Sequence, residues 1–500
     1  MQTLFFYDKP FKIAFWLIVI IESLSFLSHT YSVVNQVLFF TIIAATLIIS
    51  FWKLEYGFWI ICTELFISSF GYLFYFDAFD FRFSIRLGIF FVIFLAWLIK
   101  AVHTKQWQFY RSRLRWPFVA LLAVLAWGIV NGIINGNPLK DVFFDANAYL
   151  YFGIIFVAFS VLNTWSKINT LIQLLFASIT AMAIKTIFLL FYFAHQADIN
   201  SIRLLYTWVR DTRVGEIAPV AQNYYRIFFQ GHIWSLFSLI LLLLFLILIT
   251  KNDWLKINYK ISWVLTILAS LTLIISFSRS IWLSLIVTMF LILFYLVFKE
   301  KVKWKRISKI SVIIIAVVIA ELALITILVN LPLPGGSSDG ISAGTLVKER
   351  LTTTDEAALG SRFQLFKPLI TKFFDNPVIG SGFGTTVTYQ TLDPRTKDIN
   401  GGWYTSYSFE WGYLDIVIKI GLIGLLVYLY FIWLIIKDGI KLLKITKNKE
   451  EYLLILGLLF SLIALLITHI STPYINHPLG IFLIIISAAI LNTLKVKTLE

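Results

Sequence analysis

Residues 263–298 read WVLTILASLTLIISFSRSIWLSLIVTMFLILFYLVF, two apolar runs that meet at a short polar stretch around Arg279. A helix needs about 17 to 25 apolar residues to cross the hydrocarbon layer of a bilayer. The two runs, placed near 261–277 and 281–298, meet this requirement, and a helix satisfies its own backbone polar groups in lipid. The stretch therefore predicts a membrane-embedded helical hairpin with a permanently charged guanidinium at its turn.

The chain as a whole has the composition of a membrane protein. Of its 500 residues, 59% are hydrophobic, 17% are aromatic and only 14% are charged, and the mean hydropathy is +0.85. These values are too apolar for a water-soluble fold. The lone Cys62 lies in an apolar run and excludes an intramolecular disulfide and a thiolate metal cluster. We expect no cleavable signal peptide, because the first apolar run continues into further runs of the same kind.

Hydropathy predicts an all-α integral membrane protein with about 14 transmembrane helices. The predicted spans lie near 11–28, 34–51, 57–75, 84–102, 116–134, 147–162, 168–194, 228–250, 261–277, 281–298, 310–331, 412–436, 452–470 and 478–494. Three regions follow from this pattern. They are helices 1–11 with an outer loop near 194–227 (residues 1–330), a large extracytoplasmic loop containing short helices (residues 331–411), and helices 12–14 (residues 412–500).

The connecting segments predict the orientation of the chain. Residues 103–115, 299–309 and 437–451 are strongly basic and fall on the same side of the predicted topology. The positive-inside rule makes that side cytoplasmic, so both termini are expected in the cytoplasm. These segments account for most of the net charge of +15, and we therefore predict no nucleic-acid partner.

Arginine is distributed differently from lysine. Ten of the 14 arginines fall on the predicted outer side: Arg82, Arg86, Arg203, Arg210, Arg213, Arg226, Arg279, Arg350, Arg362 and Arg395. The planar guanidinium group binds phosphate or carboxylate with two parallel hydrogen bonds, which predicts an anionic ligand on the outer face. Arg279, at the outer mouth of its hairpin, is the first candidate, and snorkelling to lipid headgroups is the alternative.

Residues 361–375, SRFQLFKPLITKFFD, place Phe366, Leu369, Ile370, Phe373 and Phe374 on one helical stripe. Such a stripe predicts an amphipathic helix at the membrane interface. Because Pro368 is poorly accommodated inside a helix, we expect the helix to begin or kink near Lys367. An ordinary loop helix without a role of its own is the alternative.

Three motifs occur in a fixed order: SFSRSIWLSLIV (276–287), SRFQLFKPLITKFFDNPVIGSGFG (361–384) and GYLDIVIKIGLIGLLVYL (412–429). In this order the sequence resembles the bacterial O-antigen ligase and O-antigen polymerase superfamily. The resemblance implies a GT-C-like fold in the bacterial cytoplasmic membrane. It also implies an inverting, metal-independent glycosyltransferase without a cofactor, which takes a glycan from undecaprenyl diphosphate outside the cytoplasm.

Further partners follow from that resemblance. The acceptor would be a hydroxyl group of a glycan, a lipid or a protein, and a flippase and a chain-length regulator are possible partners. The leaving diphosphate gains negative charge as the glycosidic bond breaks, so fixed guanidinium groups should supply much of the catalysis. Arg279 is the first choice for this role and Arg362 the second, with Arg210 or Arg213 as a weaker third because Asp211 and Glu216 offer structural partners.

The segment Asn376-Pro377, followed by Gly380, Gly382 and Gly384, predicts a tight backbone turn. Its amide groups are candidates for binding a sugar or a phosphate, with Gly382 at the centre. A plain turn that ends a loop is the alternative.

The sequence departs from the ligase pattern at the general base. In the ligases, a His followed by Asn, Ser or Gln comes nine residues before the Gly-x-x-Gly motif of the last matched helix. Counting back from Gly421 over the nine residues 412–420 gives Trp411 as the second position and Glu410 as the first, the position of that His. A carboxylate is a competent base toward a sugar hydroxyl. Trp403 and Tyr407 lie nearby in the sequence and suit stacking on sugar faces. We therefore predict Glu410 as the base and favour a polymerase over a ligase; a helix-capping role for Glu410 is the alternative.

Transport is the competing class of function, for instance a flippase for polysaccharide or lipid-linked oligosaccharide. Charged residues inside spans are compatible with transport. Transporters, however, often show repeated halves with interrupted helices near the midplane, and the sequence contains no detectable internal repeat.

Overall fold

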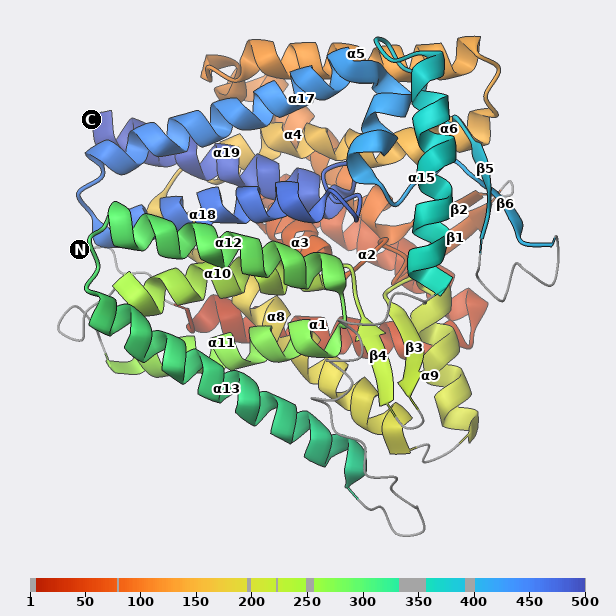
Figure 1. Cartoon of the computed structure of the whole chain (residues 1–500). Helices are drawn as coiled ribbons and strands as arrows, with labels where there is room; N and C mark the ends of the chain where they lie inside the picture. Colours follow the sequence, from red (N-terminus) through yellow and green to blue (C-terminus); the bar gives the residue numbers. More distant parts are fainter. Residues whose placement is uncertain are drawn as a thin grey trace. The chain divides into compact units, whose positions relative to one another are not determined.

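The computed structural model describes residues 6–78, 81–195, 199–221, 224–248, 256–331, 357–391 and 401–499 (Figure 1). Arg350 and Arg395 lie outside these ranges. The chain divides into two compact units. The first comprises Met1–Gln106, Val161–Leu351 and Thr446–Ser461, and the second comprises Trp107–Ser160, Thr352–Ile445 and Leu462–Glu500.

Eleven helices among the described residues are long and apolar enough to cross a membrane. They are Lys9–His29, Ser32–Trp52, Ile85–Thr104, Arg115–Ile134, Leu139–Val161, Trp165–His195, Arg279–Phe298, Trp304–Asn330, Gly412–Ile445, Lys449–Thr468 and Pro478–Lys497. Two further apolar helices, His232–Leu248 and Tyr259–Ile275, are shorter. The all-α membrane class is confirmed, whereas the count of 14 spans is not, because 11 helices of the described residues meet this criterion.

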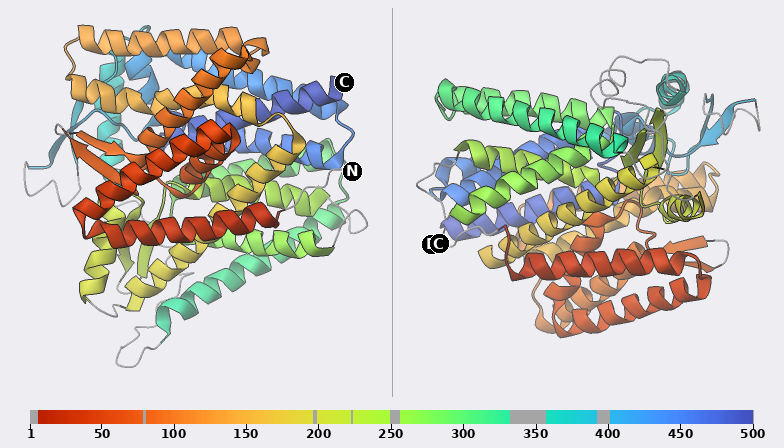
Figure 2. Two further views of the ribbon diagram at one scale, coloured as in Figure 1. Left: turned by 180° about the vertical axis from the view of Figure 1, so that it is seen from behind. Right: turned by 90° about the horizontal axis from the view of Figure 1, so that it is seen from below.

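The first unit consists mainly of apolar helices. They are α1 (Lys9–His29), α2 (Ser32–Trp52), α3 (Leu54–Ile67), α4 (Ile85–Thr104), α8 (Trp165–His195), α10 (His232–Leu248), α11 (Lys256–Ile275), α12 (Arg279–Phe298) and α13 (Trp304–Asn330). Helix α1 packs along α8, α2 packs against α3 and α4, and α11 packs against α8 and α10 (Figure 2). Apolar side chains all round these helices fit burial in lipid or against neighbouring helices.

Short polar elements join some of these helices. They are the antiparallel hairpin β1 (Tyr75–Ala78) and β2 (Phe81–Ser84), the helix α9 (Ile199–Asp211), and the antiparallel hairpin β3 (Glu216–Ala221) and β4 (Tyr224–Phe228). The sequence did not predict these strands. Four to six residues carry too little alternation to be distinguished from loops.

Two ion pairs are buried among the helices of the first unit. Arg86 donates from Nε to Glu64 Oε2 at 2.7 Å, and these side chains are 2% and 7% exposed. Lys185 pairs with Glu22, with side-chain exposures of 8% and 12%. A buried charge is tolerated only when it is paired, and both pairs meet that condition.

The second unit contains the remaining elements. They are η1 (Gln108–Arg111), α5 (Arg115–Ile134), α6 (Leu139–Ala146), η2 (Asn147–Gly153), most of α7 (Ile154–Val161), α15 (Ala357–Asp375), β5 (Val387–Gln390), β6 (Trp403–Ser406), α17 (Gly412–Ile445), the end of α18 (Lys449–Thr468) and α19 (Pro478–Leu499). Helix α17 packs along α5 and α19, and α15 packs against β5 and α17. Strands β5 and β6 form an antiparallel hairpin, in which Tyr389 pairs with Tyr404.

Helix α15 is longer than the sequence predicted. It begins at Ala357 rather than near Lys367, and Pro368 lies inside it. Leu365 and Leu369, which precede and follow this proline in the sequence, are buried in one core with Val387, Phe409 and Ile418. Tertiary packing therefore holds the helix across the missing backbone donor. The predicted apolar stripe is divided, because Leu369 faces this core whereas Phe374 is 70% exposed.

Candidate active site

Two residues singled out in the sequence form an ion pair in the second unit. Arg362 lies on α15, and Glu410 lies in the short segment between β6 and α17. The Nε–H of Arg362 donates to Glu410 Oε2. The two side chains are 29% and 54% exposed, so the pair remains accessible to solvent.

The neighbouring residue fixes the pair in place. Trp411 Nε1 donates to the backbone carbonyl of Arg362 at 3.0 Å, and its ring packs against Phe366 with 5.1 Å between ring centroids. Because Trp411 directly follows Glu410, this contact holds the backbone of both partners together. The strand hairpin next to the pair carries aromatic groups: Trp403 is 58% exposed at the start of β6, and Tyr407 is half-buried one residue after its end.

Three further side chains of the second unit that could act as a general base, Asp415, His469 and His477, are less accessible than Glu410. Asp415 is buried in the first turn of α17, and its carboxylate accepts from the Phe409 N–H at 3.3 Å. His469 is fully buried, its Nδ1 accepts from the Ile475 N–H at 3.2 Å, and burial lowers its pKa to about 3. His477 Nδ1 accepts from the Leu479 N–H at the start of α19.

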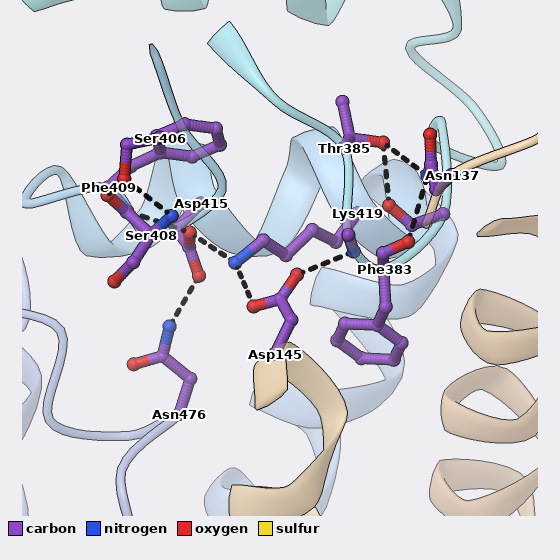
Figure 3. A network of polar contacts seen from close by, with 12 residues as sticks. Asn137, Asp145, Phe383, Thr385, Ser406, Ser408, Phe409, Asp415, Lys419 and Asn476 are labelled. Atoms are coloured by element: carbon purple, nitrogen blue, oxygen red, sulfur yellow. Dashed lines mark hydrogen bonds and ion pairs between the residues drawn. The ribbon is translucent and has the colours of Figure 1, made fainter. Parts of the chain in front are cut away.

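A buried charge cluster lies one turn further along α17. Lys419 Nζ contacts Asp415 Oδ1 at 2.6 Å and also contacts Asp145 Oδ1 on α6 (Figure 3). The three side chains are between 2% and 7% exposed. We call Asp145, Asp415 and Lys419 the lysine cluster. Sequence analysis missed Asp145; the available signal was an acidic residue next to a predicted span, with Asp415 and Lys419 spaced by four residues on one helix.

The glycine segment Gly380–Gly384 forms a tight turn, as the sequence predicted. Gly380, Gly382 and Gly384 have φ values of +77°, +88° and +77°. A Cβ atom on Gly382 would lie 2.1 Å from the Gly132 backbone nitrogen of α5, so only glycine fits there. The Gly382 N–H donates to the Lys419 carbonyl at 3.0 Å, and the turn is therefore packed closely between two helices.

This turn fills a break in α17. Gly421 has non-helical dihedrals, φ +71° and ψ 179°, which free backbone groups on both sides of it. The Ser381 N–H donates to the Ile418 carbonyl at 2.7 Å, and the Leu422 N–H donates to the Pro377 carbonyl at 2.9 Å. An interrupted helix is tolerated at membrane depth when other parts of the protein satisfy these groups.

Asparagine side chains of the second unit hold the same turn. Asn131 donates to the Gly380 carbonyl at 2.8 Å, Asn135 to the Ser381 carbonyl at 3.0 Å, and Asn137 to the Phe383 carbonyl at 2.8 Å. Figure 3 includes the last of these contacts. The turn is therefore fixed through both its N–H and its carbonyl groups.

Arg279 belongs to the first unit. It is the first residue of α12, is half-buried, and follows a tight connection from α11. In this connection Phe277 is fully buried with φ +48°, its ring lies 5.7 Å from that of Trp282, and Trp282 Nε1 donates to the Leu273 carbonyl at 2.8 Å. Arg226 on β4 donates from Nε to the Ser276 carbonyl at 3.0 Å. The position of Arg279 is thus rigidly defined.

The two weaker arginine candidates are exposed at the end of α9. Arg210 pairs with Asp211 at 2.8 Å, one of the structural partners considered above, and this hydrogen bond raises the pKa of Arg210. Arg213 lies over the ring of Tyr72 at 5.4 Å. Glu216 pairs with Arg226 at 3.6 Å rather than with either of them.

Among the described residues, no group of three or more His, Cys, Asp or Glu side chains is arranged to hold a metal ion.

Together these features define a multi-pass integral membrane protein. One of its spanning helices, α17, is interrupted at Gly421, and it carries a partly exposed Arg–Glu ion pair. Residues 264–429 match the Wzy_C family, O-antigen ligase, and the chain therefore carries an O-antigen ligase family domain over these residues. Enzymes of this family transfer glycans in membranes, and the family implies lipid-linked glycan substrates. The matched residues include Arg279, Arg362 and Glu410. None of the curated proteins compared with the chain matches it significantly.

Proposed function

We propose that this protein is an inverting glycosyltransferase that transfers or polymerises a glycan from an undecaprenyl-diphosphate-linked donor onto an acceptor hydroxyl. The observation that carries the proposal is the accessible ion pair between Arg362 and Glu410 in the matched domain. The Arg362 guanidinium suits binding of an anionic leaving group, and the Glu410 carboxylate suits removal of a proton from a hydroxyl.

The reaction breaks one bond and forms one. The acceptor oxygen attacks the anomeric carbon, its proton passes to the Glu410 carboxylate, and the bonding electrons of the glycosidic C–O bond leave with undecaprenyl diphosphate. The leaving diphosphate gains negative charge in this step, so a preorganised guanidinium lowers the barrier. We assign this role to Arg362, which lies beside Glu410 in the second unit. For Arg279, in the first unit, the role remains the prediction made from the sequence.

Binding of the donor can activate the base by displacing Glu410 from Arg362. A partly exposed ion pair of this kind contributes only about 0 to 1 kcal/mol, so a diphosphate with more charge and more acceptor oxygens competes well for Arg362. Binding of the donor then releases the Glu410 carboxylate for the acceptor hydroxyl. Donor binding and base activation are coupled through one guanidinium group.

The remaining candidate residues have supporting roles in this proposal. Trp403 and Tyr407 present aromatic surfaces for sugar rings, with Trp403 the more exposed of the two. Arg210 and Arg213 are exposed and attract the anionic donor. Gly382 contributes by shaping the turn next to α17, because its N–H is already engaged by the Lys419 carbonyl.

A polymerase is favoured over a ligase because Glu410 replaces the His of the ligases. The active site would face the extracytoplasmic side of a bacterial cytoplasmic membrane, with both termini in the cytoplasm, as the basic connecting segments indicate. The acceptor is then the growing glycan itself, and a GT-C-like arrangement of the spanning helices is expected.

The test uses purified full-length protein in lipid nanodiscs with an undecaprenyl-diphosphate oligosaccharide that carries a fluorescent sugar. A polymerase lengthens the glycan and releases undecaprenyl diphosphate, both of which chromatography and mass spectrometry detect. The same protein in sealed vesicles reports movement of the donor across the bilayer. Movement of the donor across the bilayer without a covalent product would contradict the proposal and indicate a flippase.

A further inference from the structure

The lysine cluster is joined to the backbone on both of its sides. Asp145 contacts Lys419 through Oδ1 and accepts the Gly384 N–H through Oδ2 at 2.9 Å. Asp415 accepts the Phe409 N–H through Oδ1 and an Asn476 N–H through Oδ2 at 2.5 Å (Figure 3). Each carboxylate therefore connects the ammonium group to a main-chain segment.

One of these segments carries the proposed base, and the other follows the helix of Arg362. Phe409 directly precedes Glu410, and Gly384 ends the turn that follows α15, the helix of Arg362. Apolar packing supports the same arrangement, because Leu369 of α15, Phe409 and Ile418 of α17 belong to one buried core. A single ammonium group is thus bonded, through Asp415, to the residue that precedes Glu410 and, through Asp145, to the turn at Gly384.

Stability alone is a weak reason for such a cluster. Two carboxylates and one ammonium lose most of their hydration on burial, and apolar side chains of similar volume often hold helices together equally well. Ionisable groups within membrane-spanning segments usually have a functional role. The cluster accepts hydrogen bonds from the Gly384 and Phe409 amides, and these directional bonds fix the positions of the two amides more precisely than apolar packing does.

We propose that Asp145, Asp415 and Lys419 are positioning residues that hold Glu410 in the geometry needed for glycan transfer. This inference rests on the proposed function. The cluster is buried and does not contact substrate; it acts through Glu410. A misplacement of about 1 Å is enough to slow an enzyme roughly a hundredfold.

The decisive experiment is a double-mutant cycle with Lys419→Met and Glu410→Gln. With the native Glu410, Lys419→Met should lower kcat roughly a hundredfold while the KM for the donor changes little. In the Glu410→Gln background the same substitution should cost less than about threefold, because the group that it positions is already inactive. Equal losses in both backgrounds would overturn the positioning role and reduce the cluster to a stability element.

Lys185→Met is the matched control. Lys185 is another buried lysine in an ion pair, but it lies in the first unit and pairs with Glu22. Its loss should change activity by the same factor in both backgrounds, because its ion pair is with Glu22 and not with a residue of the lysine cluster. If Lys419→Met does not express, Asp145→Asn replaces it, because asparagine keeps the shape and an oxygen that accepts the Gly384 N–H.

A second measurement is independent of activity. Hydrogen exchange of the wild type and of Lys419→Met, followed at the Phe409 amide, should become faster in the variant, because its acceptor Asp415 loses its counter-charge. Unchanged exchange at Phe409 overturns the positioning role even where transfer is slow. Failure of the wild type to transfer glycan overturns the proposed function instead, so the two failures are distinguishable.

Discussion

The indole N–H of Trp411 donates to the carbonyl of Arg362 at 3.0 Å, so the residue next to the proposed base is bonded to the residue that carries the guanidinium. This contact between a side chain and a backbone carbonyl involves neither charged group, so opening of the Arg362–Glu410 ion pair does not require its loss. The proposed site can therefore exchange the Glu410 carboxylate for a diphosphate at Arg362 without separating α15 from the start of α17.

Replacing Glu410 by Gln is expected to preserve donor binding and lower the transfer rate by roughly a hundredfold to ten thousandfold. Glutamine keeps the size of the side chain and an oxygen that Arg362 can bond, but it does not accept a proton. Expression, donor affinity and transfer rate should be measured on one preparation. A variant that matches the wild type in all three would assign Glu410 a capping or purely structural role.

Arg279→Lys is expected to behave nearly as poorly as Arg279→Ala, because a point charge does not reproduce two parallel hydrogen bonds to a diphosphate. Loss of one such contact in the transition state costs about 3 kcal/mol, or roughly a hundredfold in kcat. Steady-state transfer assays on all three proteins give this comparison. Wild-type activity in well-folded Arg279→Ala would make the residue a membrane-interface anchor.

The predicted orientation is testable by cysteine labelling in a Cys62→Ser background. A cysteine at exposed Thr405 on β6 should react with a membrane-impermeant thiol reagent added to intact cells, whereas one at exposed Lys447 should react only after the cells are opened. Ser338 and Thr396, also on the predicted outer side, lie outside the described residues. The reverse labelling pattern would place the Arg362–Glu410 pair on the cytoplasmic side.

Gly421→Ala is expected to destabilise the second unit more than Gly136→Ala. Both glycines have positive φ, +71° and +76°, a backbone conformation that costs a side-chain residue about 1 to 3 kcal/mol. At Gly136 an added Cβ meets nothing within 4 Å, whereas at Gly421 it lies 2.1 Å from the Val378 carbonyl oxygen. Overpacking adds about 1 to 3 kcal/mol at Gly421 alone. Thermal unfolding in detergent would show similar midpoints for both variants if the break in α17 were easily rearranged.

The spanning helices were predictable because their signal is local. Long apolar runs specify a helix in lipid regardless of what packs against them, and basic connecting segments separate the runs. The start of α15 was not predictable from Pro368, because the packing of Leu365 and Leu369 decides whether the helix continues. Proline chemistry alone favours a later start.

Individual residues of the candidate site could be predicted from the sequence, but the contacts between them could not. Arg362 and Glu410 were selected for their residue types and for a resemblance, and nothing in the sequence indicated that they bond to each other. Asp145 was missed because its partner Lys419 lies 274 residues further along the chain. Contacts at such separation depend on the three-dimensional packing of α5, α6 and α17, which local patterns do not report.

The break at Gly421 also constrains how the protein is made. The hydrogen-bond partners of the broken helix lie on residues 377–382, which leave the ribosome before α17 does. If α17 entered the bilayer without them, the Ile418 and Lys419 carbonyls and the Leu422 N–H would face hydrocarbon unsatisfied, at a cost of several kcal/mol each. We therefore expect biogenesis of this region to be cooperative: the polar turn and the last matched helix should enter the membrane together. A defect in the turn should then appear as failed insertion of a helix whose own sequence is intact.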